Sequence, residues 1–152
     1  MAKSINQKLK LLYLAEIFER ETDEDHGLTT GDIISRLAAK DIPVERKTVY
    51  DDINMLMDFG MDISKVYSGR YVTYHLLSRD FELPELKLLV DAVQSSRFIS
   101  EKKSRELINK LEKLVSRHDA DKLQRQVLIS GRVKSMNEST YYAVDCIHNA
   151  IS

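Results

Sequence analysis

Residues 44–63, VERKTVYDDINMLMDFGMDI, constrain the fold of this chain more than any other segment. Val49, Ile53 and Leu56 are spaced i, i+4, i+7, which is the spacing of a helix with one buried face. Gly60 then stands where a left-handed C-terminal stop is expected, and a β-type pattern follows directly. The segment therefore predicts a short helix over about 45–58 that leads into a hairpin.

The residues around this segment predict two further helices and the hairpin itself. Residues 4–21 are typical of a helix that is apolar on two sides, which needs two surfaces to bury against. A second helix starts near Thr30, with Thr29 or Thr30 as its cap. Residues 62–78 alternate in strand fashion on either side of a glycine-containing turn. Three helices followed by a β hairpin predict a winged helix-turn-helix over residues 1–80.

The pattern changes after residue 80, where two leucine-rich helical stripes appear, over 86–93 and 107–115. The stripes either close on each other as an antiparallel pair or form part of a dimer interface. We expect a helical linker or dimerisation module over 81–136, followed over 137–152 by the start of a truncated further domain. The predicted fold class is therefore α+β, mainly α, with an N-terminal winged helix-turn-helix and a helical linker module.

The charge balance limits how such a chain can bind a nucleic acid. The net charge is −1, and residues 1–80 hold 11 Lys+Arg against 14 Asp+Glu, a net of −3. DNA-binding domains are usually basic, so the affinity has to come from a local patch, helped by a homodimer that doubles it. No run approaches the roughly 20 apolar residues of a membrane span, so no membrane partner is expected.

The helix predicted over 45–58 also has a polar side. Lys47, Tyr50 and Asn54 share the side opposite the apolar stripe, where such side chains can bond base edges or phosphates. Arg46 and Thr48 fall in the first turn, where backbone N–H groups and the helix dipole favour a phosphate. The alternative interpretation is a solvated helix face with no ligand.

The hairpin adds a second group of candidate contacts around Ser68-Gly69-Arg70. A wing that lays a cation along the phosphates or into the minor groove would use Arg70 at its tip, although a charged turn is the plainer interpretation. The expected DNA-binding residues are Thr30, Arg46, Lys47, Thr48, Tyr50, Asn54, Lys65, Tyr67 and Arg70.

These residues also carry a resemblance to a known family. The segment resembles the third helix of bacterial helix-turn-helix regulators that carry a C-terminal WYL domain, the DeoR-like group. The stretch 142–151 is similar to the first helix of that sensor domain. The resemblance implies a transcriptional regulator that binds a double-stranded DNA operator. The residues that match the third helix are Glu45, Arg46, Lys47, Thr48, Val49, Tyr50, Asp52, Ile53, Leu56, Gly60 and Ile63.

Two departures from the family pattern matter. Asp51 stands where the family often has Arg, which removes one expected phosphate contact. The chain contains no Trp, so the motif that names the sensor domain is absent and no effector can be assigned.

Nothing in the sequence indicates an enzyme, a cofactor or a metal site. The four histidines lie far apart and have no metal-ligand spacing. Cys146 is the only cysteine, which excludes an intrachain disulfide and favours a cytoplasmic protein; it is interpreted as a core or interface residue of an apolar helix. The alternative to DNA binding is a winged-helix module that binds another protein instead.

Overall fold

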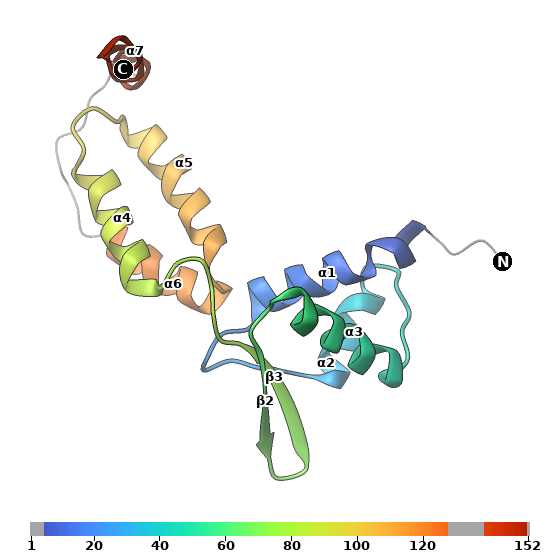
Figure 1. Ribbon diagram of the computed structural model, residues 1–152. Helices are drawn as coiled ribbons and strands as arrows, with labels where there is room; N and C mark the ends of the chain where they lie inside the picture. The colour runs from blue at the N-terminus through green and yellow to red at the C-terminus, as the bar shows by residue number, and fades with distance from the viewer. Residues whose placement is uncertain (1–4, 128–138, 152) are drawn as a thin grey trace. The chain divides into compact units, whose positions relative to one another are not determined.

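The computed structural model describes residues 5–127 and 139–151 of the chain (Figure 1). The chain is α+β and mainly helical, with one small antiparallel sheet, which confirms the broad fold class. It divides into two compact units after Asp80. The module boundary expected near residue 136 lies outside the described residues.

The first unit combines three helices with a three-stranded sheet. Its helices are α1 (Ile5–Glu21), α2 (Thr30–Ala38) and α3 (Arg46–Phe59), and its strands are β1 (Leu28–Thr29), β2 (Ile63–Ser68) and β3 (Tyr71–Leu76). The strand order is β1-β3-β2, and both pairs are antiparallel. Strand β1 was not expected from the sequence, because two residues are too few to show an alternating pattern.

One hydrophobic core holds the first unit together. Helix α1 contributes Leu14, Ile17 and Phe18, while Leu12 on another side of this helix is exposed. The helix was expected to bury both of its apolar sides, but at Leu12 the second side is exposed to solvent in the described part of the chain. The other buried members of the core are Leu28, Ile33, Leu37, Ile42, Val49, Ile53, Leu56, Ile63, Tyr74 and Leu76.

Local signals fix the ends of α2 and α3. Thr29 is the cap of α2: its hydroxyl accepts from the Asp32 N–H at 3.2 Å, and the Asp32 carboxylate accepts from the Thr29 N–H at 2.9 Å. The Thr29 hydroxyl also donates to the Asp32 carboxylate at 2.6 Å, and this hydrogen bond, together with the one from the Thr29 N–H, holds the pKa of Asp32 below its ordinary value. Helix α3 ends at Gly60, whose φ of 114° is the left-handed conformation expected there.

Strands β2 and β3 form a hairpin with a two-residue loop. Ser68 pairs with Tyr71, so the loop consists of Gly69 and Arg70. Gly69 has a φ of 59°, and a positive φ at the first loop position suits glycine in a hairpin turn. Figure 1 shows the two strands projecting from the helices as a narrow ribbon.

The second unit consists, over its described residues, of helices joined by short loops. Its elements are α4 (Leu83–Ser95), α5 (Glu101–Leu111), the 3-10 turn η1 (Glu112–Leu114), α6 (Arg117–Val127) and α7 (Ser139–Ile151). The two leucine stripes of the sequence supply one common core with α6, made of Leu86, Val90, Ile108, Val115 and Leu123. The interpretation in which these stripes close on each other therefore fits the structure.

Helix α7 contains Cys146, which was expected to be a core or an interface residue. Cys146 is exposed, so it is not a core residue of the described chain. The apolar pattern of α7 was a poor guide because Tyr142, Ile147 and Ile151 are exposed as well. Within residues 5–127 and 139–151, no helix is both long enough and apolar enough to cross a membrane.

Candidate nucleic-acid interface

Helix α3 presents a polar face to solvent. Lys47, Tyr50 and Asn54 are exposed, and they lie opposite the buried stripe of Val49, Ile53 and Leu56. Tyr50 keeps 40% of its surface exposed, so its ring leans on the protein while part of it remains accessible. Arg46 is exposed and Thr48 is half-buried. The helical wheel thus predicted this face correctly.

The N-terminus of α3 lacks the cap that other helices have. Glu45 occupies the cap position but makes no side-chain cap hydrogen bond, whereas Ser100 accepts from the Lys103 N–H at 3.2 Å at the start of α5. The first turn of α3 contains no acidic residue; it carries Arg46 and Lys47, and neither forms an ion pair with any residue that the structure describes. Open N–H groups beside two cations favour an anion at this end of the helix.

A buried ion pair fixes α3 against α1. Lys10 Nζ lies 2.7 Å from Asp52 Oδ2, and only 14% and 6% of the two side chains are exposed. In the sequence, Asp52 matches the family pattern, and the pattern predicts no role for it. An acidic residue next to the apolar stripe of a helix is a signal that could have suggested a buried partner.

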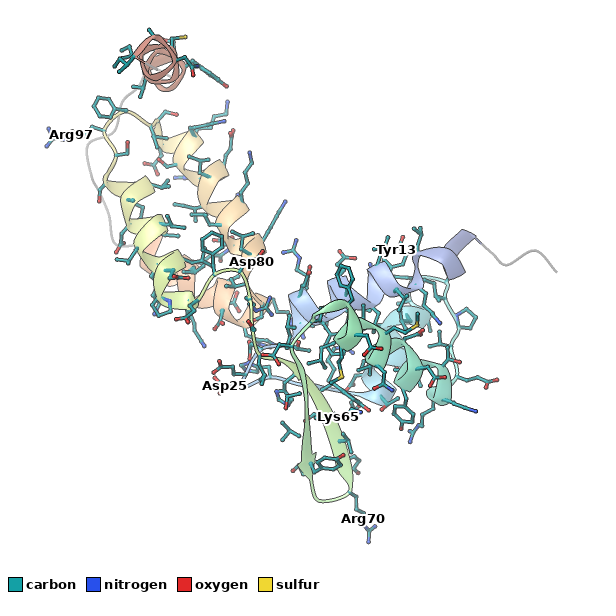
Figure 2. The ribbon with its side chains drawn as sticks, in the orientation of Figure 1. Tyr13, Asp25, Lys65, Arg70, Asp80 and Arg97 are labelled. Carbon is teal, nitrogen blue, oxygen red and sulfur yellow. The ribbon has the colours of Figure 1, made fainter. Side chains whose placement is uncertain are left out.

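The hairpin carries the second group of candidate residues. Figure 2 shows Arg70 at the free end of the hairpin, pointing away from the helices, and no described residue pairs with it. Lys65 lies across the strand pair from Tyr74, with its Nζ 5.9 Å from the centre of the Tyr74 ring. Tyr67 and Tyr71, near the tip, are both largely exposed.

Tyr74 is the point where α3 and the hairpin come together. Burial raises the pKa of the Tyr74 phenol, and the nearby phenols of Tyr50 and Tyr67 raise it further. These two phenols therefore approach Tyr74 from α3 and from β2. Helix α3 contacts strand β2, so the exposed side chains of α3 and those of Lys65 and Tyr67 belong to neighbouring elements of the first unit.

Thr30 does not belong to these exposed side chains, although it was expected among the DNA contacts. Only 7% of Thr30 is exposed, and its side chain hydrogen-bonds Tyr74. The reason lies in the sheet: β1 pairs with β3, with Leu28 opposite Tyr74, so the chain that enters α2 lies against the sheet. Thr30 is a structural residue at this position.

Acidic side chains share the exposed face of α3 with the cations. Asp51 and Asp58 are both exposed on the side opposite the buried stripe. The cations lie at the start of α3 and along the hairpin. The carboxylates lie further along α3 and also at its cap position, where Glu45 is exposed. Positive charge is therefore confined to part of this surface, which agrees with the negative net charge of residues 1–80.

The histidines of the first unit hold a loop in place. His75 is buried; its Nδ1 donates to the Asp23 carbonyl at 3.1 Å, and its Nε2 lies 2.9 Å from the Thr73 hydroxyl. The Nδ1 of His26 lies 2.7 Å from the Asp23 carboxylate. No group of three or more His, Cys, Asp or Glu side chains suited to a metal ion occurs in the described parts of the chain.

Comparisons of the chain with protein families, with curated proteins and with solved structures found no match.

Proposed function

We propose that this chain is a transcriptional regulator that binds double-stranded DNA in a sequence-specific manner. Its first unit serves as a winged helix-turn-helix in which α3 enters the major groove and the β2–β3 hairpin is the wing. The resemblance of residues 44–63 to the DeoR-like WYL regulators supports this proposal. It fits a cytoplasmic protein that acts without a cofactor and is not an enzyme.

One observation carries the proposal. Helix α3 begins without a side-chain cap and with two exposed cations, Arg46 and Lys47, that pair with no residue the structure describes. A phosphate at this end would accept from the open N–H groups and from Arg46. Lys47 and Asn54 then face base edges, and Arg70 at the wing tip reaches the backbone or the minor groove.

The modest number of cations suggests that two copies act together. A homodimer doubles the surface and reads two half-sites that lie about one helical turn apart on the DNA. Light scattering tests this part of the proposal, because a chain that remains monomeric at micromolar concentration would not bind as a preformed dimer.

The proposal predicts that Lys47→Ala weakens binding to a selected operator by about 1–3 kcal/mol, since a base or phosphate contact is lost. Fluorescence anisotropy with a labelled duplex, measured over a series of salt concentrations, gives this value. The affinity should also fall steeply as the salt concentration rises, because counterions are released when phosphates are neutralised.

The matched control is Lys110→Ala, which removes an exposed lysine of helix α5 in the other unit that pairs with no described residue. It changes the net charge by the same amount, so a general electrostatic effect would weaken binding equally in both variants. If Lys47→Ala and the parent chain bind the duplex with equal affinity, α3 is not part of the DNA interface.

A winged-helix module that binds another protein is the second candidate. Phe59 is 85% exposed and Met55 is also exposed, and both lie on α3 beside Asp51. An apolar and acidic strip of this kind suits a protein partner better than a phosphate backbone. Failure to bind any duplex, even at low salt, would favour this function over DNA binding.

A further inference from the structure

Asp51 lies in the middle of the exposed face of α3. Lys47, Asp51 and Asn54 are spaced i, i+4, i+7, so they form a line along the side opposite the buried stripe. All three are exposed, and the Asp51 carboxylate has no hydrogen bond or ion pair with any described residue. Any ligand that meets Lys47 and Asn54 also meets this carboxylate.

Asp51 makes no ion pair with a described residue, whereas carboxylates on other helices do. Arg105 and Glu101 approach to 3.1 Å one turn apart on α5, and Lys122 and Asp119 approach to 2.7 Å on α6. Lys47 and Asp51 are also one turn apart on the same side of α3, yet they do not pair. The two charges therefore remain available to two different groups of a ligand.

On the basis of the function proposed above, we propose that Asp51 is a specificity-determining residue that reads a cytosine in the major groove. A carboxylate only accepts hydrogen bonds, and phosphates repel it, so base edges with a donor are its favourable targets on DNA. Cytosine offers the N4 amino group there, whereas guanine and thymine offer acceptors. Adenine places its N7 acceptor beside its amino group, which disfavours a carboxylate.

The position of Asp51 along the helix suits this role. Residues in the N-terminal part of a recognition helix contact base edges, and Asp51 lies in the second turn of α3. Four residues of helix rise about 6 Å, against about 3.4 Å for one base-pair step, so Asp51 reaches a base pair about two steps from the one that faces Lys47. Asp58 lies about 10 Å further along the axis, beyond that part of the helix.

The test is a selection of bound duplexes from a random pool, carried out with the 152-residue chain and with two variants, Asp51→Asn and Asp58→Asn. We expect the parent chain to enrich a site with cytosine at one position. Asp51→Asn should change that position to adenine, because an amide bonds the N6 and N7 atoms of adenine. Asp58→Asn removes the same charge and should leave the selected site unchanged.

Binding to duplexes that differ at this one position gives the magnitude. We expect the parent chain to prefer cytosine by roughly tenfold or more, and Asp51→Asn to lose that preference. Because Asp51 is exposed and pairs with no described residue, the thermal unfolding of Asp51→Asn should match that of the parent chain. A changed binding site would then not reflect unfolding.

The outcomes separate this inference from the proposed function. If the parent chain and Asp51→Asn select the same site, Asp51 does not read a base, while DNA binding stands. If both Asn variants bind all duplexes more tightly and to the same extent, Asp51 acts only through its charge and the assignment is wrong. If the parent chain enriches no duplex at low salt, DNA binding itself fails, and the assignment of Asp51 fails with it.

Discussion

Gly27 lies against the imidazole of His75, in the loop that joins α1 to β1. A Cβ atom at this position would stand 2.2 Å from Nε2 of His75 and under 3 Å from two more ring atoms. The ring cannot move aside easily, because it is buried and contacts the Asp23 carbonyl and the Thr73 hydroxyl. Glycine is therefore required at position 27, because the His75 ring leaves no room for a Cβ atom.

We predict that Gly27→Ala lowers the free energy of unfolding by about 1–3 kcal/mol, the usual cost of forcing an extra carbon into a packed site. Urea denaturation followed by circular dichroism gives this value. The matched control is Gly31→Ala in α2, where the nearest atom is 3.7 Å away. That change should be neutral or stabilising, since alanine favours a helix over glycine. Equal effects of the two substitutions would contradict the packing against His75.

At the scale of elements, α3 is fixed on one side and open at its start. The ion pair between Lys10 and Asp52 holds it to α1, and Gly60 ends it, while the first turn has no side-chain cap. Asp51 and Asp52 are neighbours in sequence but differ in environment, because only Asp52 is buried. Because successive residues of a helix point in different directions, Asp52 faces the core and Asp51 faces solvent.

We predict that Asp52→Asn lowers the free energy of unfolding by about 1–3 kcal/mol, because it leaves the largely buried Lys10 ammonium without its counter-charge. Chemical denaturation measures the change. Asp51→Asn, the same substitution one residue earlier, should leave stability unchanged. The double variant Lys10→Met/Asp52→Asn should recover part of the loss, and additive losses would show that the two residues are not coupled.

The sequence could predict those features of the first unit that depend on neighbouring residues. The buried stripe of α3, its stop at Gly60 and the exposed side with Lys47 and Asn54 follow from helical spacing and turn chemistry. Two features depend on distant residues and could not be predicted. Thr30 is buried because β1 pairs with β3, and Asp52 is anchored by a lysine in the first helix.

At the scale of the whole molecule, the described chain contains two separate cores. Every member of the first core lies between Leu14 and Leu76, and every member of the second lies between Leu86 and Leu123. The boundary between the two compact units follows Asp80. Each core is thus built from one contiguous stretch of sequence, as expected of regions that can fold alone.

We predict that a fragment of residues 1–80 unfolds in a cooperative thermal transition, measured by circular dichroism, because its core is complete within it. A fragment of residues 1–70 is the control. It lacks β3, and with it Tyr74 and Leu76 of the core, so it should show no such transition. Non-cooperative melting of the longer fragment would mean that the first unit depends on the second.

Because the hairpin loop has only two residues, the number of cross-strand pairs determines how far Arg70 lies from the helices. From the pair Lys65–Tyr74 to the pair Ser68–Tyr71 the ribbon advances three residues, or about 10 Å. Removal of one cross-strand pair would shorten the reach by about 3.4 Å and would also turn the tip to the opposite face of the sheet. Only the removal or addition of two pairs preserves the direction of the tip. Insertions or deletions can therefore change the length of the hairpin without redirecting Arg70 only in steps of two cross-strand pairs, or about 7 Å.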